Sequence, residues 1–196
     1  MKICLVRHGE TEWNVRGILQ GAQDIPLNET GRAQAARTGQ VLSALKWDRV
    51  FTSHLSRAYD TGAAIAAACG LPAPTVVPHI QERDFGVFDG CPGRGEGAPT
   101  REQMAAEPTV EPREATRDRM EAALLRLCGE HYGQDIVMVS HGGALGALIS
   151  RLFGPGATGS LTNCSISLIE YREGRFHALD LNMSQDAFEE KYCNHN

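Results

Sequence analysis

Short apolar runs alternate along this chain with longer stretches in which apolar residues recur every three to five positions. The runs predict strands at residues 2–6, 49–52, 75–77, 135–139, 165–171 and 175–180. The longer stretches predict helices from the N-cap Asn28 through Leu45 and at residues 55–68, 116–127 and 144–153. This alternation predicts a three-layer α/β/α sandwich with a largely parallel sheet. The last two strands, joined by Glu173-Gly174, are expected to form a hairpin at the sheet edge.

Residues 90–112 interrupt the alternation. The segment holds four glycines and four prolines, with arginines at positions 94 and 101. We expect an irregular, lid-like excursion over the sheet at about residues 90–115, and the pattern leaves open whether it covers a substrate or has no role. Because no repeat or linker divides the chain, residues 1–196 are expected to form one domain.

Composition narrows the class of protein. Hydrophobic residues make up 42% and charged residues 22%, which is typical of a globular protein, and the net charge of -5 disfavours a nucleic-acid partner. The apolar run at the start is too short for a signal peptide, and no run reaches the roughly 18 apolar residues that span a membrane. We therefore expect a cytoplasmic protein without a membrane partner. Its six cysteines, which contain no C-x-x-C pair, are expected to be reduced. The oligomeric state is not readable from the sequence.

Polar side chains follow four of the predicted strands, at the point where each strand ends. Arg7 and His8 follow the first strand, and Arg57 lies in the first turn of the helix after the second. Glu82 follows the third strand, and His141 the fourth. Open α/β sheets bind ligands at the carboxyl ends of their strands, where helix amino ends also point N–H groups at an anion. We expect these side chains to converge at one edge of the sheet.

The residue types favour phosphoryl transfer through His8. Imidazole is a nucleophile toward phosphorus, and guanidinium binds phosphate oxygens. A nucleophilic His8 must be neutral, with one nitrogen free and the other donating to a nearby backbone carbonyl. The charges of Arg7 and Arg57 favour this neutral form, since like charges disfavour imidazolium.

The other polar residues complete the chemistry. The two guanidinium groups, with His141 and Asn14, would hold the phosphoryl oxygens, so that the transfer needs neither a metal nor a cofactor. Glu82 is expected to protonate the departing oxygen and then to deprotonate the attacking water. The residue types therefore predict phosphoryl transfer from a small phosphorylated metabolite.

Five motifs carry a family resemblance. In chain order they are Arg7-His8-Gly9-Glu10-Thr11 with Trp13-Asn14, Gln20-Gly21 with Asp24 and Pro26-Leu27, Ser53-x-Leu55-x-Arg57-Ala58, Glu82 four residues before Gly86, and Val139-Ser140-His141-Gly142. The set resembles the histidine phosphatase superfamily, which includes the cofactor-dependent phosphoglycerate mutases. Residues 163–167 further resemble the bacterial phosphoglycerate mutase-like phosphatases.

The resemblance implies roles for nine residues. It implies a phosphoglycerate mutase-like fold in which His8 is phosphorylated and Glu82 donates the proton. It also implies a phosphate pocket formed by Arg7, Asn14, Arg57 and His141 and lined by Gln20, Gly21 and the Gly142 amide.

Departures from the family pattern affect the choice of reaction. Phe88-Asp89-Gly90 stands where the family usually has Trp-Glu-Gly, and the segment between Glu82 and His141 is short beside the mutases. A mutase must keep water from phosphohistidine. A shorter segment covers the site less completely, which favours hydrolysis. The expected function is a metal-independent histidine phosphatase of small phosphomonoesters. A cofactor-dependent phosphoglycerate mutase is the alternative, and a non-catalytic phospho-ligand binding protein is the alternative from another class.

Three further points concern individual side chains. His8, His141 and Glu82 are suitable zinc ligands by type, but two neighbouring arginines would repel a cation. Arg83 and Asp84 could contact substrate or form an ion pair, and the sequence leaves this open. The remaining histidines, at positions 54, 79, 131, 177 and 195, are expected to be surface or structural residues.

Overall fold

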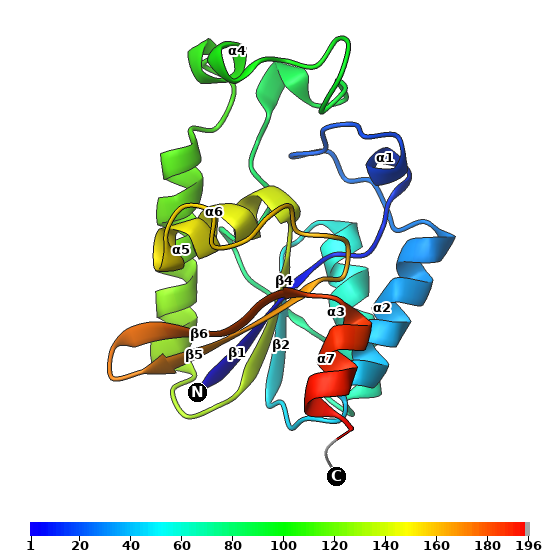
Figure 1. Ribbon diagram of the computed structural model, residues 1–196, viewed down its shortest axis with the longest axis vertical. Coiled ribbons are helices and arrows are strands. Elements are labelled where there is room, and N and C mark those ends of the chain that lie inside the picture. Colours follow the sequence, from blue (N-terminus) through cyan, green and yellow to red (C-terminus); the bar gives the residue numbers. More distant parts are fainter. Residues whose placement is uncertain (195–196) are drawn as a thin grey trace.

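A computed structural model, which describes residues 1–194, shows a six-stranded sheet with helices on both faces (Figure 1). The strands are β1 (Lys2–Arg7), β2 (Arg49–Thr52), β3 (Thr75–Val76), β4 (Ile136–Ser140), β5 (Ile166–Arg172) and β6 (Arg175–Met183). Their order is β3-β2-β4-β1-β5-β6. The first four strands pair in parallel, and β5 is antiparallel to both β1 and β6. The predicted sandwich, the largely parallel sheet and the edge hairpin are confirmed.

The two faces of the sheet bury alternate residues of the same strands. In β1, Ile3 and Leu5 pack with the helices α5 (Arg113–Glu130) and α6 (Gly142–Phe153). Cys4 and Val6 face the other way, toward α2 (Glu29–Leu42) and α3 (Ser56–Ala68). A strand covered on both faces reads as a continuous apolar run, which is why the sequence pattern located the central strands so well.

Three short helices were not predicted. They are α1 (Glu12–Val15), α4 (Arg101–Ala106) and α7 (Gln185–Tyr192). The first two begin with capping boxes, formed by Thr11 with Asn14 and by Thr100 with Gln103, and this local signal could have located them. By contrast, α7 buries only Phe188, which leaves almost no apolar period to detect. The predicted ranges of α5 and β6, residues 116–127 and 175–180, were also shorter than the observed elements.

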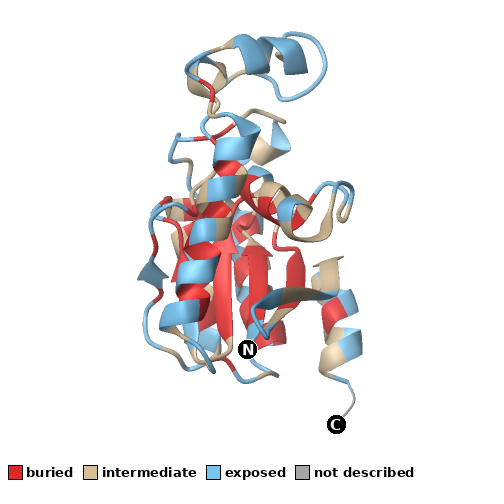
Figure 2. Ribbon diagram, turned by 90° about the vertical axis from the view of Figure 1, so that its left-hand side faces the viewer, coloured by how far each residue is buried: buried red, intermediate tan, exposed pale blue. Residues whose placement is uncertain are grey.

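The segment at residues 90–112 is irregular, as expected, apart from α4. Figure 1 places α4 at the same end of the molecule as α1, and Figure 2 shows its mostly exposed surface. Backbone hydrogen bonds from Leu19 to Cys91 and from Gly93 to Gly17 tie the start of the segment to the loop that follows α1. At its end, the Glu111 N–H donates to the carbonyl of Asp84. A substrate-covering role for this segment stays a prediction.

Two general properties follow from the described residues. Within residues 1–194, no helix is both long enough and apolar enough to cross a membrane. All six cysteines are free, and Cys4, Cys128 and Cys164 are buried. Burial raises the pKa of the Cys164 thiol to about 11, so this side chain is a packing group rather than a thiolate at neutral pH.

Candidate active site

The carboxyl ends of β1 and β4 open into a cavity of about 340 Å³ that gathers most of the predicted site residues. Those that line it are Arg7, His8, Asn14, Gln20, Glu82 and Gly142. Sequence reasoning did not anticipate the other lining residues, Ile18, Leu19, Phe85, Gly143, Gly146, Gly159, Ser160 and Leu161. Gly143 and Gly146 belong to α6, and the other six lie outside the helices and strands, in segments whose approach depends on the packed fold.

His8 lies at the base of this cavity and is 2% exposed. Its Nδ1 lies 2.6 Å from the Gly9 carbonyl oxygen, which can only accept, so Nδ1 carries the proton and Nε2 keeps a lone pair. The pKa of His8 is well below its usual range, first because of burial and then because of the Arg7 and Arg57 charges. The predicted neutral ring and carbonyl partner are present, but burial contributes more than the two charges considered from sequence.

Two hydrogen-bond donors in the cavity wall lack protein partners. Arg7 donates from Nη1 to the Leu161 carbonyl at 2.5 Å, whereas its buried Nε has no partner among the described residues. A Cβ at Gly142 would lie 3.1 Å from that Nε, so glycine allows the guanidinium to approach. Gln20 accepts from the Thr11 hydroxyl through Oε1, and its buried Nε2 is likewise unpartnered. Buried donors without partners are costly, so these two donors make the wall of this cavity a candidate binding place for an anion.

Arg57 and His141 lie behind His8 and have no exposed surface. The His8 and His141 ring centroids are 5.2 Å apart, and Arg57 Nε donates to His141 Nδ1 at 3.2 Å. Because that nitrogen accepts, the neutral His141 ring carries its proton on Nε2, which donates to Ser53 Oγ at 2.7 Å. The other Arg57 nitrogens donate to the carbonyls of Gln20, Gly21 and Gln23. Both side chains organise the site, and their direct contact with phosphate stays a prediction.

Gly21 does not line the cavity, contrary to the role that the resemblance implied. Its N–H donates to Asp89 Oδ1 at 2.7 Å, and Asp89 Oδ2 accepts from the N–H of Ala22 at 3.0 Å. A Cβ at position 21 would lie 2.5 Å from the Arg83 carbonyl oxygen. Glycine is therefore needed here for close packing of two loops, and Asp89 takes the amide that was expected to face phosphate.

Asn14 presents an amide to the cavity from α1. Its Oδ1 accepts from the Thr11 N–H at 3.2 Å and from Asn163 Nδ2 at 3.0 Å, which leaves Asn14 Nδ2 as the available donor. Asn163 Nδ2 also lies 3.1 Å from the His8 carbonyl oxygen. Asn163 was noted only as part of the family-like stretch, and its positioning contact required the folded chain.

The Glu82 carboxylate occupies the amino end of α6. Its Oε2 accepts from the Gly143 N–H at 2.9 Å, and its Oε1 accepts from the Ala144 N–H at 2.7 Å and the Arg83 N–H at 2.8 Å. A Cβ at Gly143 would lie 2.7 Å from Oε1, so glycine is required for this approach. The amino end of the helix was expected to receive an anion, and it receives a side-chain carboxylate of the protein itself.

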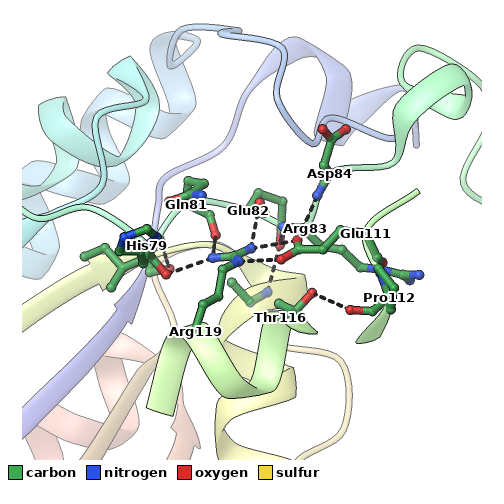
Figure 3. A network of polar contacts seen from close by, with 12 residues as sticks. His79, Gln81, Glu82, Arg83, Asp84, Glu111, Pro112, Thr116 and Arg119 are labelled. Carbon is green, nitrogen blue, oxygen red and sulfur yellow. Dashed lines mark hydrogen bonds and ion pairs between the residues drawn. The ribbon is translucent and has the colours of Figure 1, made fainter. Parts of the chain in front are cut away.

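A network centred on Arg119 holds the loop that carries Glu82 (Figure 3). From α5, Arg119 forms a two-pronged ion pair with Glu111 and donates to the carbonyls of His79, Gln81 and Glu82. Glu111 in turn accepts from Arg83 Nε through its carbonyl and from the Asp84 N–H through its carboxylate. Within residues 1–194, Arg83 and Asp84 form no ion pair. The last residues of the excursion are thus coupled to the position of Glu82.

The remaining histidines lie outside the cavity lining. His54 and His79 are exposed, and His131 and His177 are half-buried. His195 lies outside the described residues. In the described part of the chain, no three His, Cys, Asp or Glu side chains are grouped as a metal site.

The sequence matches the histidine phosphatase superfamily (branch 1) over residues 3–184. The chain belongs to this superfamily. Membership confirms the family resemblance inferred from the motifs. It also confirms the predicted enzyme class, a phosphoglycerate mutase-like phosphomonoesterase.

Similar proteins span nearly the same length. The uncharacterized phosphatase PhoE of Bacillus subtilis is 34% identical over 93% of this chain and 94% of its own. A metal-independent phosphoserine phosphatase of Arabidopsis thaliana is 32% identical over 89% of this chain and 78% of its own. A probable phosphoglycerate mutase GpmB of Salmonella choleraesuis is 35% identical over 91% of this chain and 88% of its own. A phosphoserine phosphatase variant of Entamoeba histolytica, solved with phosphoserine, superposes with a TM-score of 0.79 at 26% identity, covering 95% and 98%.

Replacing Arg119 tests the network behind Glu82. Arg119→Gln removes the charged partner of Glu111 and several donors to the carbonyls of the Glu82 loop, so the free energy of unfolding should fall by about 1–3 kcal/mol. Urea denaturation measures this change. The control is Arg126→Gln on the same helix, which breaks one exposed ion pair with Glu130 and should cost less than about 0.5 kcal/mol. Equal losses in the two variants would contradict the importance of the network.

The buried histidines predict acid sensitivity. His8 and His141 both have pKa values well below 6.5 in the folded protein, whereas the unfolded chain takes up protons near that pH. The unfolded state therefore binds more protons as pH falls, and stability decreases. Each ring should lower the free energy of unfolding by about 1 kcal/mol between pH 6.5 and 5.5. Urea denaturation at both pH values should show a smaller loss in His8→Asn than in the wild type, and an unchanged loss would contradict the assignment.

Proposed function

We propose that this chain hydrolyses small phosphomonoesters without a metal, through a phosphohistidine intermediate on His8. The observation that carries the proposal is the buried, neutral His8, whose Nδ1 is engaged by the Gly9 carbonyl while Nε2 keeps its lone pair. The unpartnered Arg7 Nε and Gln20 Nε2 in the same cavity supply donors for phosphoryl oxygens.

In the first step, the Nε2 lone pair attacks phosphorus while the bond between phosphorus and the ester oxygen breaks. Arg7, Gln20 and the Asn14 amide hold the phosphoryl oxygens, and the buried charge of Arg57 balances the bound dianion. Glu82 in its protonated form donates its proton to the departing oxygen. The products of this step are the free alcohol and phosphohistidine.

In the second step, the Glu82 carboxylate accepts a proton from water as the water oxygen attacks phosphorus. The bond between phosphorus and Nε2 breaks, inorganic phosphate leaves, and neutral His8 is restored. The hydrogen bonds from α6 hold the carboxylate at the cavity wall throughout. The similarity to a relative named as a metal-independent phosphoserine phosphatase supports this route.

A phosphoglycerate mutase is the second candidate, favoured by the similarity to a relative that is named a probable mutase. A mutase must exclude water while phosphohistidine waits for its acceptor. Here none of the residues of α4, the helix of the excursion, is buried. In this arrangement the helix therefore offers little cover that would keep water from phosphohistidine. We therefore favour hydrolysis. Conversion of 3-phosphoglycerate to its isomer in the presence of bisphosphoglycerate, without phosphate release, would favour the mutase.

His8→Ala tests the nucleophile. The variant should lose at least about a thousandfold in kcat for p-nitrophenyl phosphate, because no other group can form the covalent intermediate. Phosphate release is measured with EDTA present throughout, and wild-type turnover should persist. Retention of activity within about tenfold of wild type would exclude the phosphohistidine route.

Glu82→Gln tests the acid. The amide cannot donate a proton of comparable acidity, so turnover should fall about a hundredfold or more for an alkyl phosphate, whose leaving group needs the proton. With p-nitrophenyl phosphate, whose leaving group is good, phosphorylation of His8 should be nearly unaffected. Rapid-quench measurement of the first turnover separates this step from hydrolysis. Equal losses for both esters would remove Glu82 from the acid role.

A further inference from the structure

Two peptide groups follow His8, and each is held by different partners. The first joins His8 to Gly9. Its carbonyl accepts from the Cys164 N–H at 3.3 Å, and its N–H donates to Thr61 Oγ1 at 3.0 Å. The second joins Gly9 to Glu10, and its carbonyl is the acceptor for the proton on His8 Nδ1. The orientation of this second peptide group therefore decides which ring nitrogen of His8 carries the proton.

The Gln34 side chain holds the opposite side of the second peptide group. Gln34 lies in the second turn of α2, and its Oε1 accepts from the Glu10 N–H at 2.9 Å. Within residues 1–194, this N–H makes no other hydrogen bond. In a planar trans peptide group the N–H and the carbonyl point in opposite directions, so a partner that fixes the N–H also fixes the carbonyl. The His8 ring, the peptide group and the Gln34 amide thus form one hydrogen-bonded chain.

Gly9 makes this restraint necessary. A Cβ at position 9 would lie 2.5 Å from the Gly31 carbonyl oxygen, so glycine permits the close approach of α2. Glycine also restricts the rotation of its own backbone less than any other residue. If the peptide group turned over, the Glu10 N–H would point at His8 Nδ1 in place of the carbonyl. Nδ1 would then have to accept, Nε2 would carry the proton, and the lone pair that attacks phosphorus would be lost.

The main chain of Gln34 is itself fixed by two elements. Its carbonyl accepts from Thr38 Oγ1, in the same helix, at 2.9 Å and from Gln185 Nε2 at 2.7 Å. Gln185 is the first residue of α7. The acceptor for the Glu10 N–H therefore extends from a backbone position that both α2 and α7 hold in place.

We propose that Gln34 is a positioning residue that fixes the nucleophilic tautomer of His8 through the peptide group between Gly9 and Glu10. The inference rests on the proposed function, in which His8 attacks phosphorus through Nε2. Gln34 does not line the cavity, so it acts through the hydrogen-bonded chain and not on the substrate.

NMR measures the tautomer of His8 directly, without substrate. Two-bond ¹H–¹⁵N spectra at mildly alkaline pH, where His8 is neutral, distinguish a protonated ring nitrogen from one with a lone pair. In the wild type we expect the proton on Nδ1. Gln34→Met keeps the length of the side chain but removes the acceptor, so the ratio of the two tautomers should shift about tenfold toward a protonated Nε2, the effect of losing one hydrogen bond. Unchanged ¹⁵N shifts of His8 would overturn the inference.

Rapid-quench kinetics with p-nitrophenyl phosphate measure the consequence. The rate of His8 phosphorylation should fall about tenfold in Gln34→Met. The Kd for inorganic phosphate should change by less than about threefold, because Arg7, Asn14 and Gln20 keep their donors. Gln34→Glu retains an acceptor for the Glu10 N–H and should restore the rate to within about threefold of the wild type. Gln34→Asn has an amide that is one methylene too short to reach, and it should behave like Gln34→Met.

Gln40→Met is the matched control. Gln40 lies on the same helix and is exposed, and its side chain makes no hydrogen bond within the described residues. This variant should keep the wild-type tautomer and the wild-type rate of phosphorylation. An equal fall in the rate of the control would overturn the assignment to Gln34. A slower Gln34→Met whose His8 tautomer is that of the wild type would do so as well.

Failure of the inference and failure of the proposed function give different results. If His8→Ala abolishes turnover while Gln34→Met keeps the wild-type rate and tautomer, only the positioning role is rejected. If the wild type hydrolyses no ester, the proposed function fails. The NMR comparison of the wild type with Gln34→Met then still decides whether Gln34 sets the tautomer of His8.

Discussion

The site depends on one buried guanidinium. Arg57 has no exposed surface, and its donors join the His141 ring to three carbonyls of the loop at residues 20–23. Those hydrogen bonds set the orientation of His141 and bring the Gln20 loop to the cavity. Its charge also lowers the pKa of His8, after burial and Arg7. A positive charge that is held by hydrogen bonds in the interior can favour a neutral nucleophile and an incoming dianion at once.

Glu82 is held from two sides by different elements. The amino end of α6 donates to its carboxylate, while Arg119 of α5 binds the carbonyls of its loop. Glu111, the ion-pair partner of Arg119, ends the excursion that carries α4. The position of the proposed acid and the path of the excursion are therefore set by the same network. Glycine at position 143 permits this arrangement, since a Cβ there would force the Glu82 carboxylate to shift.

Sequence reasoning located the site better than it described the site. The doubly buried strands give strong apolar runs, so their ends, and the side chains that follow them, were placed correctly. Gly21 was placed in the phosphate pocket, but its N–H is taken by Asp89, a contact between residues far apart in the chain. Asn163 and Ser53 position other site residues, and their partners were equally invisible from local pattern. The α7 helix was missed because it buries one residue.

The sequence by itself determined the class of fold, the family and six of the residues that line the candidate site, because periodicity and motif spacing are local properties of the chain. Tertiary structure decided how these residues are used. Burial, more than neighbouring charge, keeps His8 neutral, and Arg57 and His141 lie behind the cavity rather than in its wall. Burial and the pairing of distant polar groups are set by packing.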